Sequence, residues 1–423
     1  MGQRLLVVSQ CFYPEPFRIN DLCAEWVRRG YDVTVVTSIP NYPQGDYYEG
    51  YGLRKRRREK HAGIRILRLP VIPRKKNKIC LLLNYISFLV SGLIWAHGTK
   101  RRFDRVFIFE TSPMTQALVG TAAAKRMHIP CELYVQDLWP DNVEVVAGVK
   151  NPAILSVLDR MCDRIYRDST RILVTSPSFA QTLAQRGVPK SKLLYWPQYA
   201  EDFYQPLDRD KIRRAAKTDP SAVTGLIPED DSFTLIFTGN IGVAQGLEIL
   251  PETARILKKQ AKTCPVRFVI VGDGRARESF QKAIRKKGVS ACFTLIPRQP
   301  AEIIPELFAC CDAAFLSFMD NELFARTIPA KLQSYLACGM PVIASAAGET
   351  KRVITEADAG WCCPLGDARA LAETIRTVAM KAGEDDHREL KQRGQNALKY
   401  SREHFNKQML LAQLEKLWAE RDS

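Results

Sequence analysis

The sequence predicts an α/β protein with two doubly wound domains, each built on a parallel sheet covered by helices. Three observations predict this. The 423 residues suit two cores of about 200 residues each. Short β-branched runs, apolar on both faces, alternate with helical patterns, as in βαβ units. The alternation starts again after a polar stretch at residues 201–231.

The first domain is expected to span residues 1–200. After its first strand, residues 20–29 predict a helix that Gly30 closes, and a long apolar helix precedes the strand at 105–109. Strands are predicted at residues 5–12, 33–37, 64–69, 105–109, 131–135, 171–175 and 193–196.

The second domain is expected at residues 232–400, after a linker at 201–231 that holds a short helix. Helices are predicted at about 367–382 and 387–420, with a break near 402, and the terminal segment 401–423 is long enough to return to the first domain. Strands are predicted at residues 233–237, 267–271, 293–296, 313–317, 341–344 and 360–363.

A glycine-rich loop follows the first strand of the second domain. Ligands of doubly wound sheets bind beyond the carboxyl ends of the strands, here facing a cleft between the domains. Backbone N–H groups in such a loop can approach a diphosphate, with the positive end of a helix behind them. Asn240 and Gln245 can donate to phosphate oxygens, while Gly239, Gly242 and Gly246 allow close approach. The alternative is a turn that only caps a helix.

Two cations are predicted to enter a later helix of the same domain. Lys331 follows Pro329, which suits a first helical turn, and its charge would stabilise a leaving diphosphate. Arg326 is a second candidate for that charge. The alternative for both is an ordinary surface cation. With the glycine loop, they predict a transferase that uses an activated sugar.

The net charge of +16 is concentrated in one part of the chain. Residues 54–105 hold 16 Lys and Arg against Glu59 and Asp104. We expect this window to face an anionic membrane, at about 1 kcal/mol per cation near the surface. A solvated charged loop is the alternative. The cations assigned to the membrane are Arg54, Lys55, Arg56, Arg57, Arg58, Lys75, Lys76 and Lys78.

Residues 79–96, within this window, form an apolar run that reaches the lower length limit of a membrane span. Asn84, Ser87, Ser91 and Gly92 interrupt it. We therefore expect a domain helix with an exposed apolar edge at a membrane surface. An ordinary core helix and an inserted helix remain as alternatives.

No metal and no cofactor other than the donor substrate are expected. The 12 cysteines show no CxxC or Cys/His spacing, and vicinal pairs lie in apolar runs, as reduced thiols do. The amino terminus enters a strand without a signal-peptide pattern. The predicted location is cytoplasmic, on the inner face of the cell membrane. Nucleic-acid binding is not expected, because the basic window lacks interleaved aromatic residues outside 79–96.

At this point the motifs support a family resemblance over almost the full length. The chain resembles the family-4 retaining glycosyltransferases of the GT-B fold, and looks closest to the branch for capsule, colanic-acid-like and O-antigen sugars, including fucosamine transferases. The motifs are residues 12–16 (FYPEP), 41–45 (NYPQG), 136–141 (QDLWPD), 239–247 (GNIGVAQGL), 271–274 (VGDG) and 329–341.

The resemblance implies a metal-independent transferase that moves a sugar from a nucleotide diphosphate to a lipid-linked saccharide. UDP is the expected nucleotide, and an N-acetylated amino sugar is one candidate cargo. Gly274 and Arg298 would border the base, and Thr327 would join the donor site. The family's glutamate pair falls on Arg326 and Ser334, and neither is acidic. Ser334 would then face the ribose, and Glu349 is the candidate substitute.

The acceptor is expected at loops of the first domain. Asp137 follows a strand and would orient the acceptor or the sugar hydroxyls, unless it only caps the next turn. Trp139 would stack on a sugar or else pack internally. Arg18 and Asn20 in the first loop would meet an acceptor phosphate.

Two alternative functions remain open. A nucleotide-sugar epimerase or hydrolase of the same fold would turn over donor without an acceptor. A non-catalytic, membrane-associated sugar-nucleotide-binding subunit would bind without turnover, and the missing glutamates motivate it.

Overall fold

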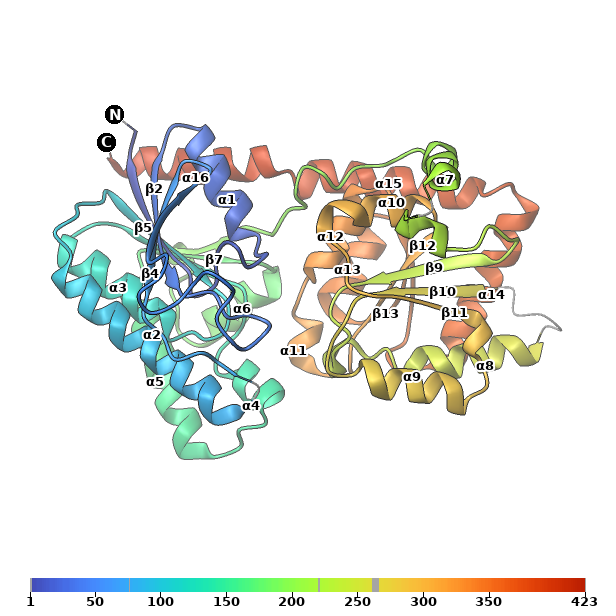
Figure 1. Cartoon of the computed structure of the whole chain (residues 1–423), viewed down its shortest axis with the longest axis horizontal. Helices are drawn as coiled ribbons and strands as arrows, with labels where there is room; N and C mark the ends of the chain where they lie inside the picture. The colour runs from blue at the N-terminus through green and yellow to red at the C-terminus, as the bar shows by residue number, and fades with distance from the viewer. Residues whose placement is uncertain (1, 76, 220, 261–265, 423) are drawn as a thin grey trace. The chain divides into compact units, whose positions relative to one another are not determined.

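The computed structural model describes residues 2–75, 77–219, 221–260 and 266–422 (Figure 1). The chain divides into two compact units, Met1–Trp196 and Pro197–Ser423. Each unit is an α/β domain with one sheet, as the sequence predicts. Lys76 lies outside the described residues.

The sheet of the first unit has eight strands in the order β3-β4-β2-β1-β5-β6-β7-β8. All neighbours are parallel except β3 and β4, which run antiparallel. The order reverses between β1 and β5, so the loops after these two strands lie at the switch point where such sheets bind ligands. The strands are β1 Arg4–Val8, β2 Asp32–Ser38, β3 Arg58–His61, β4 Ile64–Leu69, β5 Arg105–Glu110, β6 Cys131–Val135, β7 Arg171–Val174 and β8 Leu193–Tyr195.

One strand of this sheet was predicted with a wrong end, and another was not predicted. The first strand ends at Val8, not at residue 12, because the chain turns away from the ladder after the Ser9 N–H bonds to the Val36 carbonyl. The sequence did not predict β3, because Arg58, Glu59, Lys60 and His61 carry no apolar alternation. A charged strand is suited to the edge of a sheet, which is where β3 lies.

Helices cover both faces of this sheet. α2, α3 and α5 lie along one face, while α1 packs on β2 and β4 (Figure 1). Asn77 and Asn151 cap the first turns of α2 and α5, which explains where these helices begin. The helices are α1 Ile19–Arg28, α2 Lys78–Gly98, α3 Gln116–Met127, α4 Asp141–Ala147, α5 Pro152–Asp168 and α6 Pro177–Gln185, with a 3₁₀ turn η1 at Lys190–Lys192.

Helix α2 turns its small and polar residues inward. Asn84, Phe88, Gly92 and Ala96 are buried at a spacing of four, so they form one face. A Cβ on Gly92 would lie 2.4 Å from a methyl carbon of Val119, so the glycine lets α2 lie close against α3. By length and composition α2 could cross a membrane. Its exposed large apolar residues are Ile79, Leu82, Leu83, Ile86, Val90 and Ile94.

The second sheet has six parallel strands in the order β11-β10-β9-β12-β13-β14. Alternate residues of its strands enter two separate apolar cores, one on each face. The order reverses between β9 and β12, which places the loops after these strands at the switch point. The strands are β9 Phe233–Thr238, β10 Val266–Val271, β11 Phe293–Ile296, β12 Ala313–Ser317, β13 Val342–Ser345 and β14 Gly360–Cys363.

The two terminal helical stretches predicted at about 367–382 and 387–420 correspond to α14, α15 and α16. The break near 402 falls between α15 and α16. The return of the terminal segment to the first domain stays a prediction. The helices are α7 Arg209–Thr218, α8 Ile249–Gln260, α9 Arg277–Lys286, α10 Ile304–Ala309, α11 Glu322–Ala325, α12 Ala330–Ala337, α13 Gly348–Glu356, α14 Ala368–Glu384, α15 Arg388–His404 and α16 Lys407–Asp422; the 3₁₀ turns are η2 Val223–Leu226, η3 Val243–Gln245, η4 Ser290–Cys292 and η5 Ala301–Ile303.

The stretch predicted as a linker contains α7 and packs on the second unit. Arg209 forms an ion pair with Asp312 at 2.7 Å, next to β12. Arg213 donates to the Cys310 carbonyl at 3.2 Å. The polar composition of residues 201–231 therefore reflects a solvated helix on the surface of this unit.

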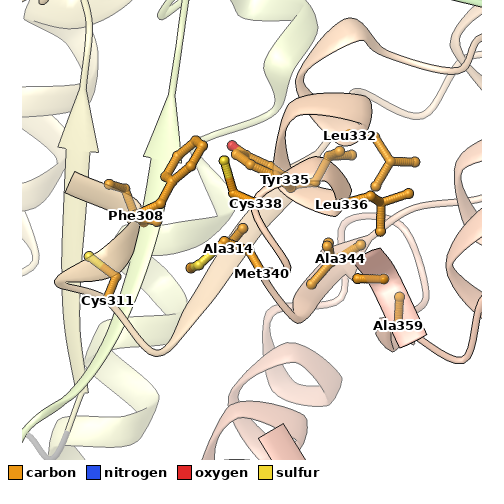
Figure 2. Packing of buried hydrophobic residues seen from close by; sticks show 14 of the residues in the cluster. Phe308, Cys311, Ala314, Leu332, Tyr335, Leu336, Cys338, Met340, Ala344 and Ala359 are labelled. Atoms are coloured by element: carbon orange, nitrogen blue, oxygen red, sulfur yellow. The ribbon is translucent and has the colours of Figure 1, made fainter. Parts of the chain in front are cut away.

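Helix α12 is anchored in the apolar core that Figure 2 shows. Tyr335 and Leu336 of α12 lie in this core with Phe308, Ala314 and Ala344 (Figure 2). The Tyr335 hydroxyl also accepts a hydrogen bond from the Thr238 N–H at 3.3 Å. This contact ties α12 to the end of β9, where the glycine-rich loop begins.

Candidate active site

The glycine-rich loop after β9 lies against the loop after β10. The Gly239 N–H donates to the Val271 carbonyl at 2.9 Å, and the Ile241 N–H donates to the Asp273 carbonyl at 2.9 Å. The Ala276 N–H returns to the Ile241 carbonyl at 3.0 Å. Two of the sequence motifs therefore form one continuous backbone surface at the carboxyl edge of the second sheet.

Gly272 allows this close approach. A Cβ at this position would lie 1.9 Å from the Gly239 carbonyl oxygen, and the residue has a φ of +151°. For both reasons, a residue other than glycine fits at this position only if the two loops move apart. The motif Val271–Gly274 thus supports the backbone of the glycine-rich loop.

We expect Gly272→Ala to destabilise the protein by about 2 kcal/mol, from backbone strain and the clash with Gly239. Nucleotide binding should weaken at least tenfold, because the shifted loop can no longer present its N–H groups. Urea unfolding and nucleotide titration measure the two effects. Gly288→Ala, at a positive φ in open space, is the control. It should cost stability but leave nucleotide binding unchanged; equal loss of binding in both variants would contradict this role of Gly272.

The glycine loop does not enter an α-helix directly, which corrects the sequence prediction. It continues into η3, and α8 begins at Ile249, three residues after Gly246. Instead, the loop after β12 supports it. The Ser317 hydroxyl donates to the Gln245 carbonyl at 2.6 Å, and the Met319 N–H donates to the Ala244 carbonyl at 3.1 Å.

Lys331 reaches this loop from α12. Pro329 is the N-cap residue of α12, so Lys331 lies in the first turn, as predicted. Its ammonium donates to the side-chain oxygen of Gln245 and lies 3.9 Å from the centre of the Phe237 ring. Withdrawal from water lowers the pKa of Lys331 to about 7. The structure thus holds a weakly basic amine against the glycine loop, with an aromatic face below it.

Asn240 and Gly274 also lie together. A Cβ on Gly274 would lie 2.6 Å from the Asn240 side-chain oxygen, and a Cβ on Gly242 would lie 2.7 Å from its nitrogen. The Asn240 amide therefore occupies space that two glycines leave open. Asn240 itself is exposed, so its remaining hydrogen-bonding capacity faces solvent.

Arg326 does not enter α12, which corrects a second prediction. Asn321 caps the short helix α11, and Arg326 forms its C-cap, paired with Glu322 at 3.1 Å. The Thr327 hydroxyl donates to the Leu323 carbonyl at 3.1 Å, so it too closes α11.

The start of α13 approaches the end of α11. A Cβ on Gly348 would lie 1.9 Å from the Ala325 carbonyl oxygen, and the Thr350 hydroxyl donates to the Thr327 carbonyl at 3.3 Å. This brings Glu349 near Arg326 and Thr327. Glu349 is buried and paired with Arg352 at 2.8 Å.

The remaining predicted donor residues differ in exposure. Ser334 is buried in α12, where its hydroxyl lies 3.4 Å from the Ala330 carbonyl. Arg298, after β11, is exposed. The structure brings Gly239, Asn240, Gly242, Gln245, Gly246, Gly274 and Lys331 together, while Arg298, Arg326, Thr327, Ser334 and Glu349 remain predictions as ligand contacts.

In the first unit, Asp137 is held at the carboxyl end of β6. Its carboxylate accepts from the Ser112 N–H at 2.9 Å and from the Ser112 hydroxyl at 2.8 Å. The same hydroxyl oxygen accepts from Trp139 Nε1 and from Asn142, each at 3.1 Å. Burial raises the pKa of Asp137, and the two hydrogen bonds from Ser112 oppose that rise.

Trp139 is 7% exposed, so its indole packs inside the unit. Stacking on a sugar stays a prediction that this burial disfavours. Sequence reasoning missed Glu110, which ends β5 beside this network. Glu110 is fully buried, neither carboxyl oxygen has a partner among the described residues, and burial raises its pKa well above the usual range. The sequence did contain a signal for Glu110, because a charged residue at the end of an apolar strand is unusual.

Asn20, predicted in the first loop, lies in the first turn of α1 and holds that loop in place. The Asn20 side chain accepts from the Tyr13 N–H at 3.0 Å and donates to the Glu15 carbonyl at 2.8 Å. Arg18 is half-buried, and its charge acts on the Tyr134 hydroxyl. Contact of either residue with an acceptor phosphate stays a prediction.

The cations assigned to the membrane differ in their surroundings. Arg54, Lys55, Arg56, Arg58 and Lys78 are exposed. Arg57 instead donates to the Leu53 carbonyl at 3.1 Å and to the Arg68 carbonyl, and Lys75 is paired with Asp46. Lys76 lies outside the described residues.

Within residues 2–75, 77–219, 221–260 and 266–422, no group of three or more His, Cys, Asp or Glu side chains could hold a metal ion. The expected independence from metal stays a prediction.

Two family models match the chain one after the other. The model described as "Glycosyl transferase 4-like domain" matches residues 17–198, and the model described as "Glycosyl transferases group 1" matches residues 225–397. Together they cover both described units apart from the termini and residues 199–224.

Among curated proteins, the chain is 24% identical to an Escherichia coli protein named as colanic acid biosynthesis glycosyl transferase WcaI, over 82% of this chain and 84% of that protein. It is 24% identical to a GDP-mannose-dependent alpha-mannosyltransferase of Mycobacterium tuberculosis, over 86% and 85% of the two chains.

Among solved structures, sucrose-phosphate synthase from Thermosynechococcus elongatus aligns with a TM-score of 0.74 at 15% identity, over 99% of this chain and 98% of that chain. Anabaena HepE in complex with UDP aligns with a TM-score of 0.69 at 14% identity, over 99% and 100%. At these identities the likeness concerns the fold.

Proposed function

The chain is a family-4 glycosyltransferase with the GT-B fold, and on that premise we propose that it is a retaining, metal-independent enzyme that builds a surface polysaccharide. It uses a nucleotide-sugar donor. In the proposed reaction, the bond between the anomeric carbon and the diphosphate breaks, and a hydroxyl of a lipid-linked saccharide forms the new bond.

The position of Lys331 beside the glycine-rich loop is the observation that supports the proposed donor site. Gln245 lies directly beside the ammonium, and the Asn240 side chain lies between Gly242 of its own loop and Gly274 of the neighbouring motif. A diphosphate over this loop would meet backbone N–H groups and the ammonium of Lys331. Because negative charge develops on the departing diphosphate, Lys331 would stabilise the transition state.

We propose UDP as the nucleotide and an N-acetylated amino sugar as one candidate cargo. Family membership supports this choice, as does the resemblance to the branch that contains fucosamine transferases. HepE has been crystallised with UDP and with UDP-glucose, whereas the mycobacterial relative is named as dependent on GDP-mannose. Both bases therefore belong in the test.

We propose that the acceptor is lipid-linked and that the enzyme works on the cytoplasmic face of an anionic membrane. The outward apolar face of α2 supports this, since Ile79 is 73% exposed and Ile94 is 69% exposed. The exposed cations Arg54, Lys55 and Arg56 add an attraction for anionic headgroups.

Calorimetric titration of the protein with UDP, GDP, ADP and their sugars, without metal, tests the donor side. One nucleotide family should bind, and Lys331→Ala should weaken that binding at least tenfold, or about 1.4 kcal/mol. Lys282→Ala, an exposed lysine on α9 paired with Glu278, is the matched control and should bind as the wild type does.

Failure of the whole panel to bind would overturn the proposed donor. Donor turnover in water, with no gain from a lipid-linked acceptor in vesicles, would favour a hydrolase instead. Product analysis by NMR tests retention, because the anomeric configuration of the donor must persist in the product.

A further inference from the structure

A short segment before α2, residues 72–75, is fixed to the helix by two polar side chains. The Asn84 amide donates to the Ile72 carbonyl at 2.6 Å, and the Ile72 N–H donates to the Ser87 hydroxyl at 2.9 Å. Asn84 also accepts from the side chain of Gln10 at 2.8 Å. The polar residues that interrupt the apolar helix therefore hold this segment at the carboxyl edge of the first sheet.

Arg74 lies in the held segment. Its N–H donates to the Asn41 side chain at 3.3 Å, and its guanidinium lies 4.8 Å from the centre of the Tyr42 ring. The buried carboxylate of Glu15 accepts from the N–H groups of Asn41 and Tyr42 at 2.8 and 2.7 Å. Among the described residues Arg74 has no ion pair.

The neighbouring cation differs in this respect. Lys75 is paired with Asp46, and its own N–H bonds to the Gly45 carbonyl. Arg74 thus keeps its charge and its planar set of donors uncommitted while its backbone is fixed. An arginine in this state matches the paired oxygens of a phosphate or diphosphate.

The surroundings of Arg74 belong to the candidate acceptor loops. Burial raises the pKa of Tyr85 on α2, and the charge of Arg74 opposes that rise. Cys11, after β1, and Asp137, after β6, also act on the Tyr85 hydroxyl. The charges of Arg74 and Asp137, which come from different loops, therefore both act on the same phenol.

The residues next to Tyr85 on α2 are apolar and exposed. Leu82, Leu83 and Ile86 lie within one helical turn of it and make up part of the outward face. A ligand held at Arg74 that also carries a hydrocarbon chain could lay that chain along this face.

We infer that Arg74, stacked on Tyr42 and fixed by Asn41 and Asn84, binds the diphosphate of a polyprenyl-diphosphate-linked acceptor, whose lipid lies along the outward face of α2. The inference rests on the proposed function, because it names the chemical class of that acceptor and the residue that holds it. In this arrangement the diphosphate is at Arg74 and the saccharide extends toward Asp137.

The test is titration of full-length protein with geranylgeranyl diphosphate in detergent micelles, and separately with inorganic pyrophosphate. Every sample carries Lys331→Ala, so that the glycine loop does not bind the probe in place of Arg74. Arg74→Gln should weaken geranylgeranyl diphosphate binding at least tenfold, and Arg74→Lys should bind with an intermediate affinity. Arg102→Gln removes an exposed cation of the same window and should change the affinity less than twofold.

Two results would overturn the inference. One is equal binding of geranylgeranyl diphosphate with and without Arg74. The other is pyrophosphate binding as tight as that of the lipid, which would indicate a site for a free anion. The double variant Arg74→Gln, Lys331→Ala should melt at the same temperature as Lys331→Ala, because the Arg74 side chain forms no ion pair among the described residues and stacks on Tyr42.

Failure of this inference is separable from failure of the proposed function. With Lys331 intact, Arg74→Gln should bind nucleotide sugars as the wild type does. If the protein binds its donor but its binding of lipid diphosphate does not depend on Arg74, the proposed function stands and this inference fails. If the protein binds no nucleotide but needs Arg74 to bind lipid diphosphate, the proposed donor fails and the Arg74 site stands.

Discussion

Replacing Leu82, Leu83, Ile86 and Val90 of α2 by serine should reduce binding to anionic liposomes more than a hundredfold. All four side chains are exposed, so the variant loses little packing within the protein. In a membrane interface each would be buried, at about 1.5–3 kcal/mol for a large apolar side chain. Even partial insertion of four such residues therefore exceeds the roughly 2.7 kcal/mol that a hundredfold change requires.

Liposome sedimentation at several lipid concentrations measures the effect, and circular dichroism checks that α2 persists. Leu226→Ser with Met380→Ser removes two exposed apolar residues of the second unit and serves as the control. The control should sediment as the wild type does. If the α2 variant sediments as the wild type does, the exposed apolar face of α2 does not bind the membrane, and that part of the proposed function is wrong.

Donor binding should depend on pH through Lys331. Only the charged form attracts a diphosphate, and in the free protein the pKa of Lys331 is about 7. The affinity should be greatest below pH 6.5 and fall about tenfold per pH unit above the pKa, as the charged fraction falls. A nucleotide sugar is the right ligand for the titration, because its diphosphate has no terminal phosphate that titrates near pH 6.

Lys331→Arg keeps its charge at every pH in this range, so its binding should not vary with pH. A flat profile for the wild type, or a steep one for the arginine variant, would contradict the assignment. The free protein gives an independent measurement. The folded pKa lies below the unfolded value of about 10.4, so the unfolded chain binds more protons between these values and stability should rise with pH across that window. Lys331→Met should accordingly stabilise the nucleotide-free protein most at pH 6 and least near pH 10.

The strands were predictable because each is a short apolar run bounded by polar residues. The strands at Ile64–Leu69, Cys131–Val135 and Phe293–Ile296 match their predicted bounds. The prediction failed for β3, which has no apolar run. β3 is charged on both faces, and it forms because β4 offers an open edge, which no local pattern reveals.

The donor loop was predictable in composition but not in its contacts. Gln245 and Lys331 are 86 residues apart in sequence, and only the packing of α12 through Tyr335 brings them together. Arg326 was predicted to enter the same helix as Lys331. It ends α11 instead, because Asn321 caps a helix only four residues long.

Helix α2 shows a further limit of sequence reasoning. Its mean hydropathy predicts an apolar helix and does not tell which side faces the protein. Asn84 decides this, because its partners Gln10 and Ile72 come from other segments. The orientation of α2 therefore depends on tertiary hydrogen bonds, and the polar residue that weakened the case for a membrane span is the one that turns the apolar side outward.

The edge strand β3 has a consequence for work with this protein. An open strand edge can pair with the edge of another molecule, and charged side chains such as Arg58 and Lys60 oppose that pairing by repulsion. Neutralising the whole run from Arg54 to Arg58 to release the protein from lipid would also remove part of this protection. Self-association into sheet-extended oligomers could then pass for membrane binding in a pelleting assay. Changing Arg54, Lys55 and Arg56 alone leaves the guarded edge intact.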